Sequence, residues 1–357
     1  MWVKSLNIRN LRNISSAQID LNPCLNCFIG DNGAGKTSIL EALSVLSKGR
    51  SFRTGQISSL IGPLAKSFQV VSKIDSQSGD THQLGMERNE NDWMARHNGA
   101  DVSHLSELTQ LIPHVLLEPN SHTLVSGPPD GRRRFLDWGV FHVEHNHLLL
   151  WRRYNRVLKQ RNAALKQSNR MVVESLDSQY VQFGEQLHLA RQKHVQLFNV
   201  ILQEQLLLFC ETLEGIALDY KKGWSGDSLA EAIRVSEVRD MERGLTGSGP
   251  HKADLVLSLS GVPARERLSR GEQKAMTAAM IMAQAQIICE SGERPILMLD
   301  DLSSELDEAH LAKVLKAGVD LGVQVLLTGT ELAPAVKSYE GRYTVFHVKQ
   351  GAIVNPD

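Results

Sequence analysis

Residues 30–37 read G-D-N-G-A-G-K-T and match the pattern of a phosphate-binding loop. In such a loop the glycines let successive backbone N–H groups turn inward around phosphates, and the helix that follows adds its positive end. Lys36 is expected to reach the outer phosphates as a point charge, in binding and in catalysis, and the Thr37 hydroxyl to ligate Mg²⁺. The sequence therefore predicts a site for a nucleoside triphosphate and Mg²⁺ built from Gly30, Asp31, Asn32, Gly33, Ala34, Gly35, Lys36 and Thr37.

Two adjacent carboxylates follow an apolar run at residues 295–299. A buried strand that ends in a carboxylate places Asp300 at the carboxyl edge of a sheet, beside the glycine loop, as a second Mg²⁺ ligand. Asp301 is then positioned to orient or activate an attacking water. The same pair could instead cap a helix, because residues 303–307 resemble a turn into one. The glycine loop favours the metal interpretation.

The flanking segments supply the elements that such a site needs. The apolar run 25–29 is typical of a strand, and Ile39, Leu40, Leu43 and Leu46 recur at helical spacing after the loop. The alternating runs 3–8 and 17–21 predict a strand pair at the start of the chain, and further strands are expected at 295–299, 323–327 and 343–348. The fold class is therefore α/β, with mixed sheets around the helix that follows the loop.

The middle of the chain is mostly helical. Apolar residues recur at helical spacing over 149–166 and, after a polar break at 167–174, over 176–208. The second stripe covers only about four heptads, which favours a helical hairpin over a long coiled coil. We therefore expect a core lobe of residues 1–125 and 293–357 and a largely helical second lobe of residues 126–292.

Charge is unevenly distributed although the net charge is −1. Between residues 132 and 170 there are ten Lys and Arg against two acids, a surplus of eight. Asymmetry of this kind indicates a nucleic-acid face, with a solvated helix surface as the alternative. The predicted DNA contacts are Arg132, Arg133, Arg134, Arg152, Arg153 and Arg156.

Composition points to a soluble protein. Hydrophobic residues make up 42% of the chain and charged residues 22%, which is ordinary for globular domains. The first ten residues do not resemble a targeting signal, and no apolar stretch approaches the roughly 20 residues of a membrane span. We expect a cytoplasmic protein with no membrane partner.

A second phosphate-reading element is predicted at residues 268–274, L-S-R-G-E-Q-K. It resembles the signature element of ABC-type ATPases, and residues 303–307, S-S-E-L-D, resemble their D-loop. The resemblance implies that two protomers sandwich two ATP molecules, with Ser269 and Gly271 of one protomer contacting the γ-phosphate held by the other. Ser269 followed by Glu272 is also a capping box, and both interpretations can hold together.

Within this superfamily the chain resembles the RecF family of bacterial repair proteins over its whole length. The resemblance includes the segments 52–54 (F-R-T), 132–139 (R-R-R-F-L-D-W-G), 158–165 (L-K-Q-R-N-A-A-L) and 249–254 (G-P-H-K-A-D). It implies an ATP-dependent DNA-binding homodimer that recognises gapped, double- and single-stranded DNA. It also implies work with RecO and RecR to load RecA in repair, replication restart and SOS induction.

Two departures from the wider ABC pattern predict slow hydrolysis, used as a switch. Asp301 stands where many relatives carry Glu, and residues 325–330 contain no histidine at the place of the transporter switch histidine. The missing histidine and the basic insert argue against a transporter subunit. A chromosome-organising protein needs a much longer coiled coil, and a phage-defence nuclease needs a further acidic metal domain.

Overall fold

The structure is a computed structural model, and it describes residues 1–76, 78–144, 146–210, 213, 215–302, 306–339 and 341–354. Two compact units divide the chain: unit 1 comprises Met1–Ser121 and Ala278–Asp357, and unit 2 comprises His122–Thr277. Relative to the boundaries expected from sequence, residues 122–125 belong to unit 2 and residues 278–292 to unit 1. The second boundary differs because it falls inside one continuous helix, α9 (Arg270–Glu290).

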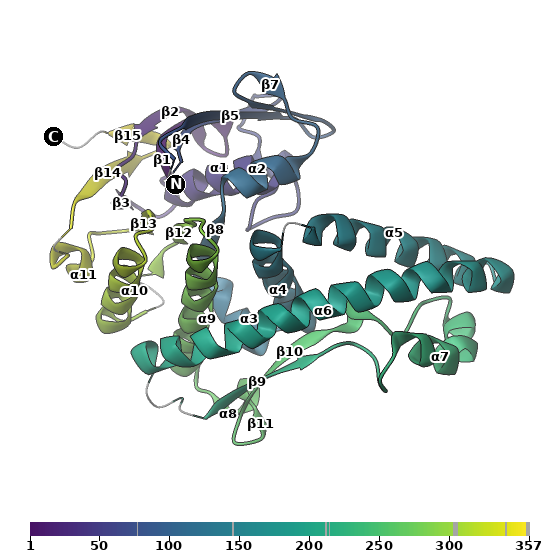
Figure 1. Cartoon of the computed structure of the whole chain (residues 1–357). Coiled ribbons are helices and arrows are strands. Elements are labelled where there is room, and N and C mark those ends of the chain that lie inside the picture. The colour runs from purple at the N-terminus through teal and green to yellow at the C-terminus, as the bar shows by residue number, and fades with distance from the viewer. Residues whose placement is uncertain are drawn as a thin grey trace. The chain divides into compact units, whose positions relative to one another are not determined.

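Unit 1 contains two six-stranded sheets (Figure 1). The first is antiparallel, in the order β2-β1-β4-β5-β6-β7, and the second, β15-β14-β3-β13-β12-β8, is parallel except for its edge strand β15. The strands are β1 Trp2–Leu11, β2 Ile14–Asp20, β3 Leu25–Ile29, β4 Phe68–Asp75, β5 Thr81–Arg88, β6 Trp93–His97, β7 Ala100–Asp101, β8 His114–Leu117, β12 Ile296–Leu299, β13 Val325–Gly329, β14 Tyr343–Lys349 and β15 Ala352–Val354. The helices are α1 Lys36–Lys48, α2 Leu105–Leu111, α10 Glu308–Asp320 and α11 Pro334–Lys337.

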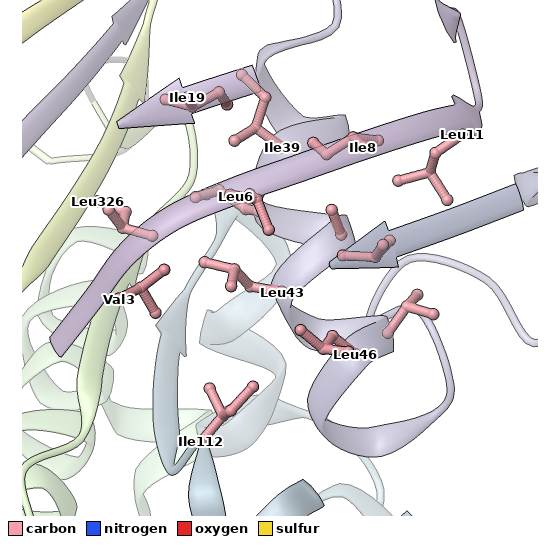
Figure 2. Close-up of a cluster of buried hydrophobic side chains, with 14 of the residues drawn as sticks. Val3, Leu6, Ile8, Leu11, Ile19, Ile39, Leu43, Leu46, Ile112 and Leu326 are labelled. Atoms are coloured by element: carbon pink, nitrogen blue, oxygen red, sulfur yellow. The ribbon is translucent and has the colours of Figure 1, made fainter. Parts of the chain in front are cut away.

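Helix α1 lies in the main hydrophobic core of unit 1, where its residues pack against β1 and both sheets. Figure 2 shows side chains of β1 and α1, among them Leu6 and Leu43, gathered in this cluster. Buried polar groups on the helix are paired, for example Ser47, whose hydroxyl donates to the Ile112 carbonyl at 3.0 Å. A helix surrounded in this way has little freedom to move, so its first turn is a rigid platform for the loop before it.

Unit 2 is mainly helical, with one three-stranded antiparallel sheet in the order β11-β10-β9. Helices α5 and α6 run alongside each other as a hairpin (Figure 1). Its elements are α3 Thr123–Ser126, α4 Pro129–Val143, α5 His147–Lys166, α6 Arg170–Phe209, β9 Ile216–Lys221, α7 Leu229–Arg243, β10 Asp254–Leu259, β11 Val262–Pro263 and α8 Ala264–Arg267.

The elements expected from sequence agree with this architecture. The opening strands pair antiparallel, with Ile8 opposite Ala17, and the helical hairpin turns at residues 167–169. The expected α/β fold with mixed sheets and a largely helical second lobe is confirmed. Among the described residues, no helix is both long enough and apolar enough to cross a membrane.

Candidate nucleotide-binding site

The glycine loop joins β3 to α1, as predicted. Two of its glycines have positive φ, Gly33 at 77° and Gly35 at 112°, which side chains rarely adopt. A Cβ on Gly30 would overlap the backbone carbonyl of Val348, and one on Gly35 would lie 2.9 Å from Asn13 Oδ1. The loop therefore needs glycine for its path and for its close packing, and the backbone it exposes can cradle phosphates.

Lys36 is the first residue of α1, and it is buried. Its Nζ donates to the carbonyls of Gly30 at 2.6 Å and Asp31 at 3.0 Å. The ammonium group therefore lies within the loop, where it is predicted to bind the outer phosphates. Asp31 and Asn32 are exposed on the outer turn of the loop, whereas Ala34 is buried. A cation held among the loop carbonyls offsets the charge of a phosphate bound there.

The loop is joined to the end of β12 by a side-chain hydrogen bond. The Thr37 hydroxyl donates to Asp300 Oδ1 at 2.9 Å, across 263 positions of sequence, and the Thr328 hydroxyl donates to the same oxygen at 2.7 Å. Burial raises the pKa of Asp300, and the bonds from Thr328 and Thr37 act in the opposite direction. A buried carboxylate beside a hydroxyl is a hard-oxygen pair that suits Mg²⁺, and the cation would compensate the desolvated charge.

Asp301 follows with a left-handed backbone, φ 49°, and its N–H donates to Thr328 Oγ1 at 2.9 Å. Thr328 therefore forms hydrogen bonds with both Asp300 and Asp301. It lies on β13, the strand in which no switch histidine is present. Asp301 lines a cavity of about 550 Å³ together with Arg12, Asn13, Asn32, Gly33, Ala34, Gly35, Lys36, Thr37, Ser38, Arg53, Ser59, Ile61 and Pro63. This size and lining suit a nucleotide.

Arg12 and Asn13, in the turn between β1 and β2, were not singled out from sequence. Arg12 forms a two-pronged pair with the buried Glu41 of α1, at 2.8 and 3.0 Å, and the Asn13 amide donates to the Gly33 carbonyl at 3.0 Å. Their position in a polar turn far from the loop gave no chemical signal. Only the pairing of β1 with its neighbours brings this turn to the cavity.

Glu118, directly after β8, was also missed. Burial raises its pKa to about 7, with the charge of Asp300 as the next cause. Strand β8 pairs with β12 so that Leu117 lies opposite Leu299, which sets Glu118 beside Asp300. A lone Glu after an apolar run carries no motif in sequence, and only the strand order reveals it.

Ser269 and Gly271, in unit 2, are exposed at the start of α9. The Glu272 N–H donates to Ser269 Oγ at 3.3 Å, and Glu272 Oε2 accepts from the Ser269 N–H at 2.8 Å, so the capping box is formed. Apart from its chain neighbours and the backbone of its own helix, no atom of the described residues lies within 4 Å of a Cβ placed on Gly271. A capped, open helix start is compatible with phosphate contact, which stays a prediction here. Residues 303–305 of the expected D-loop lie outside the described residues.

The basic segment divides into interior and surface arginines. Arg132 is 11% exposed and binds both carboxylate oxygens of Asp254, at 2.8 and 3.0 Å, while Arg133 donates to the Ala253 carbonyl at 2.9 Å. Arg161, fully buried, pairs with Asp177 and Asp240. The surplus of charge counted from sequence therefore overstates the basic surface, because a buried arginine is committed to its partners.

Four of the predicted DNA-contacting arginines do face solvent. Arg134 is 64% exposed and pairs with Asp130 one helical turn away. Arg152, Arg153 and Arg156 are exposed on α5. The structure thus leaves these four side chains on the surface, where DNA could reach them, whereas Arg132 and Arg133 serve mainly to hold α4 against β10 and the residue before it.

Comparison with known proteins places this arrangement in a family. The model of the RecF/RecN/SMC N terminal domain matches residues 2–353. The chain is 39% identical to the DNA replication and repair protein RecF of Xanthomonas euvesicatoria, covering 99% of this chain and 98% of that one. It is 38% identical to the protein of the same name from Stenotrophomonas maltophilia, covering 99% of each.

Solved structures agree on the fold. A structure of the recombination mediator protein RecF-ATP in the RecFOR pathway has a TM-score of 0.89 at 23% identity, covering 100% of this chain and 98% of that one. An Smc head domain from Pyrococcus furiosus has a TM-score of 0.59 at 14% identity, covering 100% and 96%. With its loop, aspartate pair and whole-length likeness to these relatives, the chain belongs to the RecF family.

Proposed function

We propose that the chain is an ATP-dependent DNA-binding protein of recombinational repair. The observation that carries the proposal is the Thr37–Asp300 hydrogen bond, since it joins the glycine loop to the end of the carboxylate strand, next to Asp301, which lines the nucleotide cavity. The relatives named DNA replication and repair protein supply the biological context. On this proposal the protein acts in the cytoplasm, with RecO and RecR, to promote RecA loading, replication restart and SOS induction.

ATP bound with Mg²⁺ would supply a phosphoanhydride bond whose slow cleavage resets the switch. Thr37 and Asp300 would hold the cation, and Lys36 would neutralise the outer phosphates. Asp301 would orient the attacking water, with a shorter reach than glutamate, which supports a weak, DNA-stimulated ATPase.

Homodimerisation follows from the resemblance to sandwich ATPases. Ser269 and Gly271 of one copy would close the nucleotide site of a second copy, where the helix start of α9 adds favourable partial charge. The exposure of both residues supports this role. Gapped DNA, with its double- and single-stranded parts, would then bind the dimer.

The sandwich is tested by mass measurement in solution with ATP, using light scattering. The unmodified chain should double its mass, and Lys36→Met and Ser269→Arg should each remain monomeric. Mixing the two variants should restore part of the dimer, because one of the two shared sites then has an intact loop and an intact signature. No recovery on mixing, with the unmodified chain dimeric, would show that Ser269 does not act across the dimer.

DNA binding is tested with labelled gapped and fully duplex DNA, with and without ATP. Tighter, ATP-dependent binding of the gapped substrate is expected for the unmodified chain and should be lost in Lys36→Met. Failure of the unmodified chain to bind either DNA would overturn the proposed function.

A further inference from the structure

A second cavity, of about 890 Å³, lies wholly within unit 2. One face of α6, the end of β9 with the turn after it, Arg239 of α7, and Gly247, Ser248 and Lys252 form its walls. This volume is in the upper range of ligand sites. No step of the proposed ATP switch uses it.

The cavity is strongly basic. Lys221, Lys222, Arg239 and Lys252 line it, and no Asp or Glu is among its described lining residues. Within the described part of the chain, Lys221, Arg239 and Lys252 are exposed and form no ion pair. Lys222 donates to the Gly226 carbonyl at 2.6 Å and so fixes the turn after β9. Cations gathered without acids favour an anionic ligand.

Three rings line the same cavity in a row. The His188 ring stacks on Tyr220, with centroids 5.6 Å apart and an interplanar angle of 17°, and meets the edge of Trp224 at 5.1 Å. Lys222 Nζ lies 5.1 Å from the centroid of the Trp224 ring. Aromatic faces beside cations are the combination that stacks bases while holding phosphates.

Polar atoms of the lining also lack partners. His188 Nδ1, Asn199 Oδ1 and Trp224 Nε1 are buried, and none forms a hydrogen bond within the described residues. Buried groups in this state cost free energy that a ligand can recover by pairing with them. Of these atoms, His188 Nδ1 and Trp224 Nε1 belong to two of the three contacting rings.

We propose that this cavity binds a single-stranded segment of nucleic acid. Its phosphates would pair with Lys221, Arg239 and Lys252, and an unstacked base would lie against Trp224. A duplex keeps its bases stacked on one another, and an acidic peptide brings carboxylates without flat rings, so a single strand matches the cavity best. The inference rests on the proposed DNA-binding function and assigns the single-stranded part of the DNA to unit 2.

The charge contribution is measured by anisotropy of a labelled 15-nucleotide oligo-dT with the full chain and ATP, over a range of salt. Each phosphate contact contributes about 0.7 to the salt slope for single strands. The triple variant Lys221→Gln, Arg239→Gln, Lys252→Gln should therefore lower the slope by about 2. Arg234→Gln, an exposed cation on the same helix as Arg239 but outside the cavity, is the matched control and should leave the slope unchanged.

The ring contribution is measured with Trp224→Leu and Trp224→Phe. Loss of one stacking platform should weaken oligo-dT binding roughly tenfold in the Leu variant, and the Phe variant should retain most of the affinity. Thermal unfolding of both variants shows whether the fold is kept. If Trp224 had only a structural role, its replacement would lower the unfolding temperature, and the Leu and Phe variants would bind oligo-dT with equal affinity.

Three outcomes overturn the inference. In the first, the unmodified chain binds gapped DNA, but the triple variant and Trp224→Leu bind oligo-dT as tightly as the unmodified chain does. This result leaves the proposed function intact. Another is binding of a labelled oligo-glutamate peptide at the cavity in place of oligo-dT, which assigns an acidic peptide. The last is an unmodified chain that binds no DNA, which removes the proposed function as well.

Discussion

The glycine loop of unit 1 and the basic segment of unit 2 (residues 132–170) were both predicted from sequence to bind ligands, but their side chains are placed differently in the structure. Residues 32–37 of the loop, which sequence assigned to phosphate or metal, line one cavity, and Thr37 bonds to Asp300. In the basic segment, Arg161 is buried and Arg132 is nearly so, while Arg152 and its neighbours on α5 are exposed.

The difference has a physical cause. A phosphate loop works through its own backbone, so spacing alone defines it. A charged side chain works only if it reaches solvent or a ligand, and its partners come from distant parts of the chain. Arg161 pairs with residues 16 and 79 positions away, and Arg132 with one 122 positions away.

The same buried pairs explain segments that resemblance alone singled out. Thr246 accepts from Arg161 at 2.8 Å and donates to Asn162 at 2.7 Å, which ties the 158–165 segment to the turn after α7. His251, in the 249–254 segment, accepts at Nδ1 from Tyr154 at 2.8 Å and donates from Nε2 to the Thr246 carbonyl at 3.0 Å. These segments therefore build the interior of unit 2.

The largest effect is expected from removing the interior cation. Arg161→Met leaves Asp240 buried without its cation, and should lower the free energy of unfolding by about 3–5 kcal/mol. Lys159→Met, two positions away and exposed, should change it by less than about 0.5 kcal/mol. Urea unfolding followed by circular dichroism measures both. Equal changes in the free energy of unfolding would mean that the interior and surface cations of this segment contribute equally to stability.

A glycine of the loop should come next. Gly30→Ala places a methyl group against the Val348 carbonyl, and the backbone must shift to remove the overlap. This shift should lower the free energy of unfolding by about 3 kcal/mol and weaken ATP binding. Gly271→Ala, with open space around it, should leave the unfolding temperature and ATP binding by the monomer unchanged. Calorimetric titration with ATP and a thermal melt distinguish the two glycines, and an unaffected Gly30→Ala would argue against a closely packed loop.

Acid should weaken unit 2 through His251. Burial lowers its pKa to about 4, below the unfolded value of about 6.5, so the unfolded chain takes up the proton first. Stability from this group is complete above about pH 6.5 and is lost as the pH falls toward 4, by about 2 kcal/mol between pH 7 and pH 5. In urea titrations at the two pH values, the free energy of unfolding of the His251→Gln variant should fall by about 2 kcal/mol less than that of the unmodified chain. An equal fall in both proteins would contradict the assignment.

The smallest effect on stability should come from the exposed arginines of α5. Replacing Arg152, Arg153 and Arg156 together by Gln should shift the free energy of unfolding by less than about 0.5 kcal/mol. Duplex binding should nevertheless weaken, and the salt slope should fall by about 0.9 for each phosphate that one of these arginines neutralises. Filter binding at several salt concentrations measures this, and an unchanged slope would mean that this surface is only solvated.

Much of the nucleotide site could be predicted from the sequence. Glycine spacing, the lysine and the threonine define a loop whose chemistry is local, and an apolar run ending in Asp300 predicts its place at the sheet edge. Thr328, Glu118 and Arg12 could not be found in this way, because each lies on a different strand or turn and reaches the site only through strand order.

The sequence by itself determined the phosphate loop, the carboxylate strand, the helical hairpin and the family. Each of these depends on residues that are neighbours along the chain or on similarity along its whole length. Only the tertiary structure decided which arginines are interior supports, which residues complete the nucleotide cavity, and that a basic, ring-lined cavity exists in unit 2. These properties depend on burial and on partners distant in sequence, and a linear pattern of charge carries neither.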